Sequence, residues 1–211
     1  MTAWVGSVPR AIGGMALVLV PLAAAAQTAQ DAPPVRVRGE IASVDDRVVT
    51  VQTRDGEVAR LELAADARVL GMAPTTPEAL AVDDVIGAAA AGQPGEPQEA
   101  VVVVVVPEEL GGAGEGYFTW DLTPDTMMIQ GVVRGVEAGP DGLVLSVYYP
   151  QAGATVVVPP DVPVVALEAG DAGLLQPGSH VFVPSAERRP DGTLSTGLVA
   201  VGRNGFVPPM M

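Results

Sequence analysis

The chain contains an internal repeat that covers most of its length. Residues 37–44 (VRGEIASV) return as residues 129–136 (IQGVVRGV), and each copy continues through valine-rich segments, a polar interlude and a final valine-rich segment. A period of about 95 residues is too long for a solenoid unit and suits a small self-contained domain. The sequence therefore predicts two similar small domains in tandem.

The segments of each copy have the pattern of β-strands. Residues 35–44 alternate apolar side chains with charged ones, which is the period of a strand with one face in water. Asp55-Gly56 predicts a tight turn because glycine adopts positive φ readily. A single helical turn is predicted at 75–80. Three strands, a short helix and two strands is the order of a small OB-like barrel. The predicted fold is all-β, with two tandem five-stranded OB-like barrels.

Linkers and composition shifts predict six segments along the chain. They are a signal peptide at 1–26, a linker at 27–34, a first barrel repeat at 35–107, a glycine-rich aromatic linker at 108–128, a second barrel repeat at 129–203 and a C-terminal tail at 204–211. Whether the tail is a recognition segment or a frayed end stays open.

The first 26 residues have the pattern of a secretory signal peptide. Arg10 precedes an apolar run at 11–26, and Ala24-Ala25-Ala26 supplies small residues for cleavage before Gln27. The run has 16 residues, fewer than the roughly 20 that cross a bilayer as a helix. We therefore expect a periplasmic or secreted bacterial protein without stable membrane insertion after cleavage. An anchor that is not cleaved is the alternative.

The charge of the chain is strongly acidic. It has 25 Asp and Glu residues against 11 basic residues, all of them arginine, and a net charge of −14. Such a surface repels nucleic acid and anionic lipid and mainly confers solubility. There is no cysteine, so no disulfide forms. These features are typical of a bacterial envelope protein of ordinary size.

The glycine and valine motifs of the repeats carry a resemblance. A strand followed by Gly-x-Val/Ile, and later Leu175-Gln176-Pro177-Gly178 with Val181, resembles a family of exported bacterial proteins of unknown function. Members of that family carry one or more small OB-like barrels, so the resemblance implies the same fold over residues 35–107 and 129–202. The first copy departs from the motif, with Val82-Asp83-Asp84 in place of residues 176–178. The family implies no catalytic residue.

The polar residues form no catalytic pattern. His180 is the only histidine, and no serine lies in a Gly-x-Ser-x-Gly elbow. The acidic pairs at 45–46, 83–84 and 108–109 are sequence neighbours, whose side chains point to opposite faces of a strand and cannot flank one bond. We expect a protein that is not an enzyme and has no cofactor.

An aromatic cluster lies between the two copies. Tyr117, Phe118 and Trp120 follow the glycine-rich stretch in a chain that is poor in aromatic residues. They are expected to pack in the groove between the barrels, because exposed aromatic residues in a linker are costly. The alternative is a patch that stacks on a ligand. The expected function is binding or scaffolding through this groove, with a protein or an oligosaccharide as partner.

Methionine residues suggest a second function. Met127, Met128, Met210 and Met211 occur as two pairs, and thioether sulfur is a soft ligand that prefers Cu(I). The alternative function is therefore a periplasmic copper-handling accessory protein. Against it, methionine also fills gaps in protein cores.

Six consecutive valines run from Val101 to Val106. A strand with one face in water would alternate, so both faces of this strand are expected to be covered. The cover is either the rest of the monomer or a second subunit, and the second case predicts an oligomer.

Overall fold

The computed structural model describes residues 1–2, 34–111, 114–150 and 152–209, and twelve β-strands make up most of this part. The first five strands are β1 (Val35–Asp45), β2 (Val48–Thr53), β3 (Val58–Thr75), β4 (Val85–Ala91) and β5 (Gln98–Val106). The other seven are β6 (Gly116–Thr119), β7 (Thr126–Gly139), β8 (Gly142–Tyr149), β9 (Ala152–Val158), β10 (Val164–Ala169), β11 (His180–Arg188) and β12 (Leu194–Gly202). Short 3-10 turns are η1 (Pro77–Ala79), η2 (Glu108–Leu110), η3 (Ala172–Leu174) and η4 (Arg203–Gly205). The all-β prediction is confirmed.

Strands β1, β2, β3, β12 and β11 close into the first barrel. β1, β2 and β3 form an antiparallel meander. β12 runs parallel to β3, and β11 lies antiparallel to both β12 and β1. A five-stranded barrel closed in this way has the arrangement of an OB fold.

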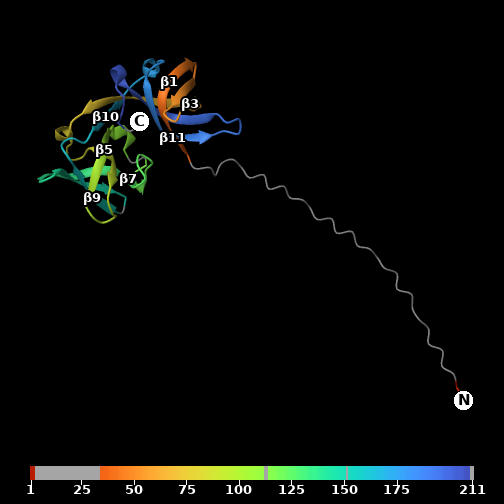
Figure 1. Cartoon of the computed structure of the whole chain (residues 1–211), viewed down its shortest axis with the longest axis horizontal. Coiled ribbons are helices and arrows are strands. Elements are labelled where there is room, and N and C mark those ends of the chain that lie inside the picture. The colour runs from red at the N-terminus through yellow and green to blue at the C-terminus, as the bar shows by residue number, and fades with distance from the viewer. Residues whose placement is uncertain (3–33, 112–113, 151, 210–211) are drawn as a thin grey trace.

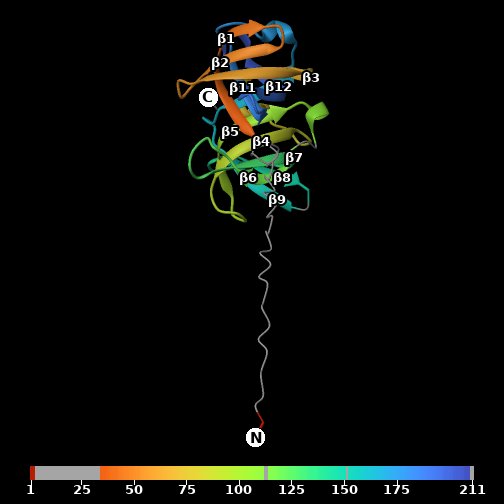
Figure 2. The same cartoon turned by 90° about the vertical axis from the view of Figure 1, so that its right-hand side faces the viewer.

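Strands β7, β8, β9, β5 and β4 close the second barrel in the same way. β7, β8 and β9 form the meander, β5 runs parallel to β9, and β4 lies antiparallel to both β5 and β7. Figure 1 shows β1, β3 and β11 in one lobe and β5, β7 and β9 in the other. Figure 2 shows the two lobes stacked on each other.

Each barrel contains strands from both repeats, which corrects the prediction of one barrel at 35–107 and another at 129–203. The first barrel takes β11 and β12 from the second repeat, and the second barrel takes β4 and β5 from the first. The reason lies in β3, which runs for 18 residues without a turn and carries the chain out of the first barrel. The exchanged hairpins are β4–β5 and β11–β12. Because the repeats are similar, each hairpin pairs with strands that are equivalent to those of its own repeat.

The junction between the barrels is an antiparallel ladder of β3 and β10. At its centre Met72 lies opposite Leu167, 95 positions further along the chain. The same offset relates Leu80 to Leu175, which occupy equivalent places after the junction strands. A residue that faces its own counterpart marks a local twofold axis, so the exchange of hairpins is symmetrical.

The strand patterns place apolar side chains in three clusters. The first barrel is filled by residues such as Val49, Leu61 and Val199, and the second by residues such as Ile129 and Leu145, all fully buried. A third cluster lies between the barrels and includes Leu70, Met72, Ala89, Val102, Met128, Val165 and Ala200. Burial of a large aliphatic side chain stabilises a fold by about 1.5–3 kcal/mol, so the contact between the barrels is held by its own apolar core.

The six-valine strand is covered on both faces within the chain. Val103 and Val105 contact the core of the second barrel, and Val102 and Val104 contact the cluster between the barrels. Val101 is 37% exposed. The monomer thus covers most of this strand but leaves Val101 exposed, and association through the strand stays a prediction.

Residues 3–26 of the predicted signal peptide lie outside the described residues. No helix in the described ranges is long and apolar enough to cross a membrane.

Candidate ligand-binding site between the barrels

The segment predicted as a linker at 108–128 contains a strand, β6. β6 pairs with the start of β7, with Tyr117 opposite Ile129 and Phe118 opposite Met128. Alternation along β6 sends Tyr117 to the second barrel, where its hydroxyl donates a hydrogen bond to Gln98 Oε1 at 3.2 Å. Phe118 lies on the other face, in the cluster between the barrels. The structure therefore separates Tyr117 from the other two predicted contact residues.

Trp120 contacts both Phe118 and a third aromatic residue, Phe182 on β11. The ring centroids of Phe118 and Trp120 are 6.2 Å apart and those of Trp120 and Phe182 are 6.1 Å apart, both edge to face. Phe182 was not identified as a candidate residue from the sequence. The available signal is its position in β11, where its neighbours Val181 and Val183 fill the first barrel and an apolar residue between them must face outward.

A cavity of about 500 Å³ lies beside these rings, and we call it the interbarrel cavity. Its walls are mainly aliphatic and aromatic side chains from both repeats. They include Leu70, Val102, Val104, Leu110, Phe118, Trp120, Met128, Leu167, Phe182 and Leu198. Ligand pockets typically have about 300–1,000 Å³ and mostly apolar walls, so the interbarrel cavity has the size and lining of a small-molecule site.

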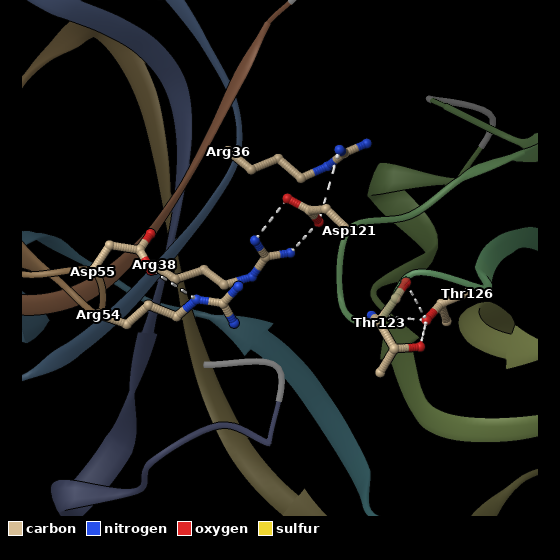
Figure 3. Close-up of polar contacts among 7 residues, drawn as sticks. All are labelled: Arg36, Arg38, Arg54, Asp55, Asp121, Thr123 and Thr126. Carbon is tan, nitrogen blue, oxygen red and sulfur yellow. Dashed lines mark hydrogen bonds and ion pairs between the residues drawn. The ribbon is translucent and has the colours of Figure 1, made fainter.

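Two arginines of β1 lie at one side of the rings. Arg38, with 5% of its side chain exposed, donates two hydrogen bonds to the carboxylate of Asp121, at 3.0 and 2.6 Å. Arg36 lies 3.8 Å from the same carboxylate, and its guanidinium stands 4.1 Å from the centre of the Trp120 ring. Figure 3 shows the Asp121 carboxylate between the two arginines. Cations over aromatic faces are attracted by the ring quadrupole.

The turn that carries Asp121 is closed by its own hydrogen bonds. The backbone N–H of Trp120 donates to the carbonyl of Thr126 at 2.9 Å, and the Thr126 hydroxyl bonds the backbone of Thr123 (Figure 3). The hydrogen bonds from Arg38 hold the pKa of Asp121 below its ordinary value, against the opposing effect of partial burial. The carboxylate is therefore charged at neutral pH and fixes the turn on β1.

A second, polar cavity of about 320 Å³ lies at the end of the first barrel. Five of the eleven arginines of the chain line it, together with three carboxylates. The arginines are Arg36, Arg38, Arg54, Arg60 and Arg188, and the carboxylates are Asp55, Glu57 and Asp121. Arg36 lines this cavity and the interbarrel cavity. Although the protein is acidic, the interbarrel cavity thus adjoins a polar cavity with more arginines than carboxylates.

The remaining residues singled out in the sequence lie elsewhere. Met128 lines the interbarrel cavity, whereas Met127 is its neighbour on β7 and points to the opposite face. Met210 and Met211 lie outside the described residues. His180 begins β11 opposite Glu40. Among the residues that the structure describes, no three His, Cys, Asp or Glu side chains are grouped so as to hold a metal ion.

Comparison of the chain with protein-family models, with curated proteins and with solved structures finds no match.

Proposed function

We propose that the protein is a non-enzymatic binding module of the bacterial cell envelope that holds a small apolar ligand in the interbarrel cavity. The observation that carries the proposal is the cavity itself, about 500 Å³ with aromatic and aliphatic walls. It includes two of the three aromatic residues that the sequence singles out, Phe118 and Trp120. Export is proposed from the signal-peptide pattern of residues 1–26.

The size of the cavity favours binding over simple packing. The cavity is partly open to solvent and is much larger than a water molecule, whose share of liquid volume is about 30 Å³. The atoms that line a larger apolar void lack contacts on one side. An apolar ligand restores those contacts, whereas water finds few polar partners there. Trp120 packs edge to face against both Phe118 and Phe182, so part of the wall is already packed without a ligand.

The test is the binding of a neutral apolar fluorescent probe, N-phenyl-1-naphthylamine, to protein purified from a host that exports the full chain. We expect saturable fluorescence enhancement at one probe per chain. Leu198→Trp, which fills part of the cavity, should weaken probe binding at least tenfold. Val82→Trp, at a turn position that is 52% exposed, is the matched control and should bind the probe as the parent does.

The probe result decides the proposal. Absence of saturable binding, or equal binding by the parent and Leu198→Trp, would remove the interbarrel cavity as a ligand site. Thermal unfolding of both variants checks that each is folded.

A further inference from the structure

Arg36 is a cation with unused hydrogen-bonding capacity at the rim of the interbarrel cavity. A guanidinium has five N–H donors. The Arg36 guanidinium makes no side-chain hydrogen bond to the described residues, and its one ion pair there, to Asp121, is long at 3.8 Å. Its side chain is 26% exposed, and its Nε–H is buried without a hydrogen-bond partner among the described residues. Arg38, by contrast, is already engaged through both terminal nitrogens.

The position of Arg36 is fixed rather than arbitrary. Its guanidinium lies over the Trp120 ring, and the Trp120 turn is held on β1 by the Arg38–Asp121 pair. Because Arg36 lines both the interbarrel cavity and the polar cavity, its charge stands where the apolar walls end. An anion that binds Arg36 therefore has apolar walls on one side of it and a polar, arginine-lined space on the other.

The difference between the two copies of the repeat makes the interbarrel cavity asymmetric. Alignment of the two copies on Gly39 and Gly131 places Arg36 and Met128 at equivalent positions, and both side chains line the cavity. One side of the twofold arrangement thus offers a cation and the other a thioether. A ligand that matches both sides has a charged end and an apolar end.

The charge balance favours an anion that also has an apolar part. The polar cavity has five arginines against three carboxylates, and Arg60 and Arg188 pair with no carboxylate in the described part of the chain. The whole chain carries a net charge of −14, which repels free anions at long range. Burial of an apolar chain supplies the attraction that a small free anion lacks.

We infer that the ligand of the interbarrel cavity is an apolar carboxylate of the fatty-acid type, with its head group on Arg36 and its chain among Phe118, Trp120 and Phe182. This inference rests on the proposed function. A carboxylate pairs with a guanidinium through two parallel hydrogen bonds, as Asp121 does with Arg38. A phosphate can pair in the same way, but it carries more negative charge at neutral pH, which the neighbouring Asp121 carboxylate and the net charge of −14 repel more strongly.

The experiment measures displacement of N-phenyl-1-naphthylamine from the exported protein by ligands that differ in one feature. Decanoate is compared with decanol for the charge, with butyrate for the chain and with decyl phosphate for the head group. We expect decanoate to bind at least tenfold more tightly than decanol and decyl phosphate, and butyrate not to displace the probe. Lengthening the acid should tighten binding by about fourfold per methylene.

Variants locate the head group. Arg36→Gln should bring the affinity for decanoate down to that for decanol and leave decanol unchanged. Arg47→Gln, which removes the same charge in the exposed turn between β1 and β2, should keep the preference for decanoate. Equal binding of decanoate and decanol by the parent, a preference that survives Arg36→Gln, or tighter binding of decyl phosphate would overturn the inference while probe binding keeps the proposed function. Failure of the probe to bind would overturn both.

Discussion

At the scale of single residues, the Arg38–Asp121 pair joins the first strand to the segment between the repeats. The guanidinium of Arg38 is 5% exposed and the carboxylate of Asp121 is 47% exposed. A buried charge that loses its partner costs far more than a surface pair gains. Sequence alternation assigns Arg36 and Arg38 to the wet face of a strand. It does not reveal that residues 120–122 fold over that face and enclose them.

Replacement of Asp121 tests this pair. We expect Asp121→Asn to lower the free energy of unfolding by about 1–2 kcal/mol at pH 7, because it leaves the Arg38 guanidinium without an anion and the half-exposed partner limits the effect. Asp125→Asn, an exposed neighbour in the same segment, is the matched control and should change stability by less than about 0.5 kcal/mol. Urea unfolding measures both.

The same pair gives stability a pH dependence. The pKa of Asp121 in the folded protein lies below its ordinary value of 3.8. As the pH falls, the unfolded chain takes up this proton first, so the contribution of the carboxylate is complete above about pH 5 and is lost as the pH falls through the folded pKa. The stability difference between the parent and Asp121→Asn should therefore shrink below about pH 4. A difference that is the same at pH 7 and pH 2.5 would contradict this assignment.

At the scale of elements, one glycine in each repeat fixes how closely the first two strands of the meander approach. A Cβ at Gly39 would lie 2.1 Å from the carbonyl oxygen of Gln52, and one at Gly131 would lie 2.3 Å from that of Tyr148. The glycine common to VRGE and IQGV is therefore a requirement of backbone packing. This explains why both copies of the repeat motif keep this glycine.

Alanine at these glycines should destabilise both barrels. We expect Gly39→Ala and Gly131→Ala each to cost about 1–3 kcal/mol, because a backbone carbonyl cannot move aside as a flexible side chain can. Gly197→Ala, where no atom lies within 4 Å of the added carbon, is the control and should stay within about 0.5 kcal/mol of the parent. Chemical denaturation of the three variants compares them, and equal stability of all three would refute the packing argument.

The strand pattern was largely predictable, whereas the partners of the strands were not. Alternation and glycine turns identify the segments that form β1, β2, β4 and β5, because each carries its own local signal. Alternation of Leu61 and Leu63 with charged residues predicts a third strand at 58–64. In the structure β3 continues to Thr75, since residues 65–69 contain no turn signal that would stop it. Which hairpin closes which barrel has no local signal at all, because similar repeats present similar edges.

The candidate site was predictable only for those residues that have a local sequence signal. Phe118 and Trp120 were identified because aromatic residues are rare in this chain and these lie between the repeats. Tyr117 was grouped with them by proximity in sequence, and the alternation of β6 separates it. Phe182 and Arg36 lie on β11 and β1, far from Trp120 in the sequence, and the fold brings them to the Trp120 ring.

At the scale of the whole molecule, neither repeat contains a complete barrel of the kind observed. The first repeat supplies the meander of one barrel and the closing hairpin of the other. The 18-residue β3 is continuous with the segment that crosses between them. An isolated repeat must therefore either bend β3 and close on its own hairpin, or exchange hairpins with a second copy.

A fragment of residues 34–111 distinguishes the two outcomes. We expect it to form a dimer with two exchanged barrels, because β3 has no turn residues at its centre and the β3–β10 ladder would be replaced by a symmetrical β3–β3 ladder around Met72. Light scattering after size-exclusion chromatography measures the mass. An insertion of four Gly-Ser residues after Ala65 should shift the fragment toward monomer, and a compact monomer without the insertion would contradict the expectation.

The symmetrical ladder at Met72 and Leu167 also bears on ancestry. A dimer of single repeats would have carried the same residue at both ends of its central cavity, so it would have suited ligands that are alike at both ends. Duplication and fusion of such a gene would free the two ends to mutate separately. Arg36 and Met128 are an example of such divergence, which would give a once symmetrical cavity one charged end and one apolar end.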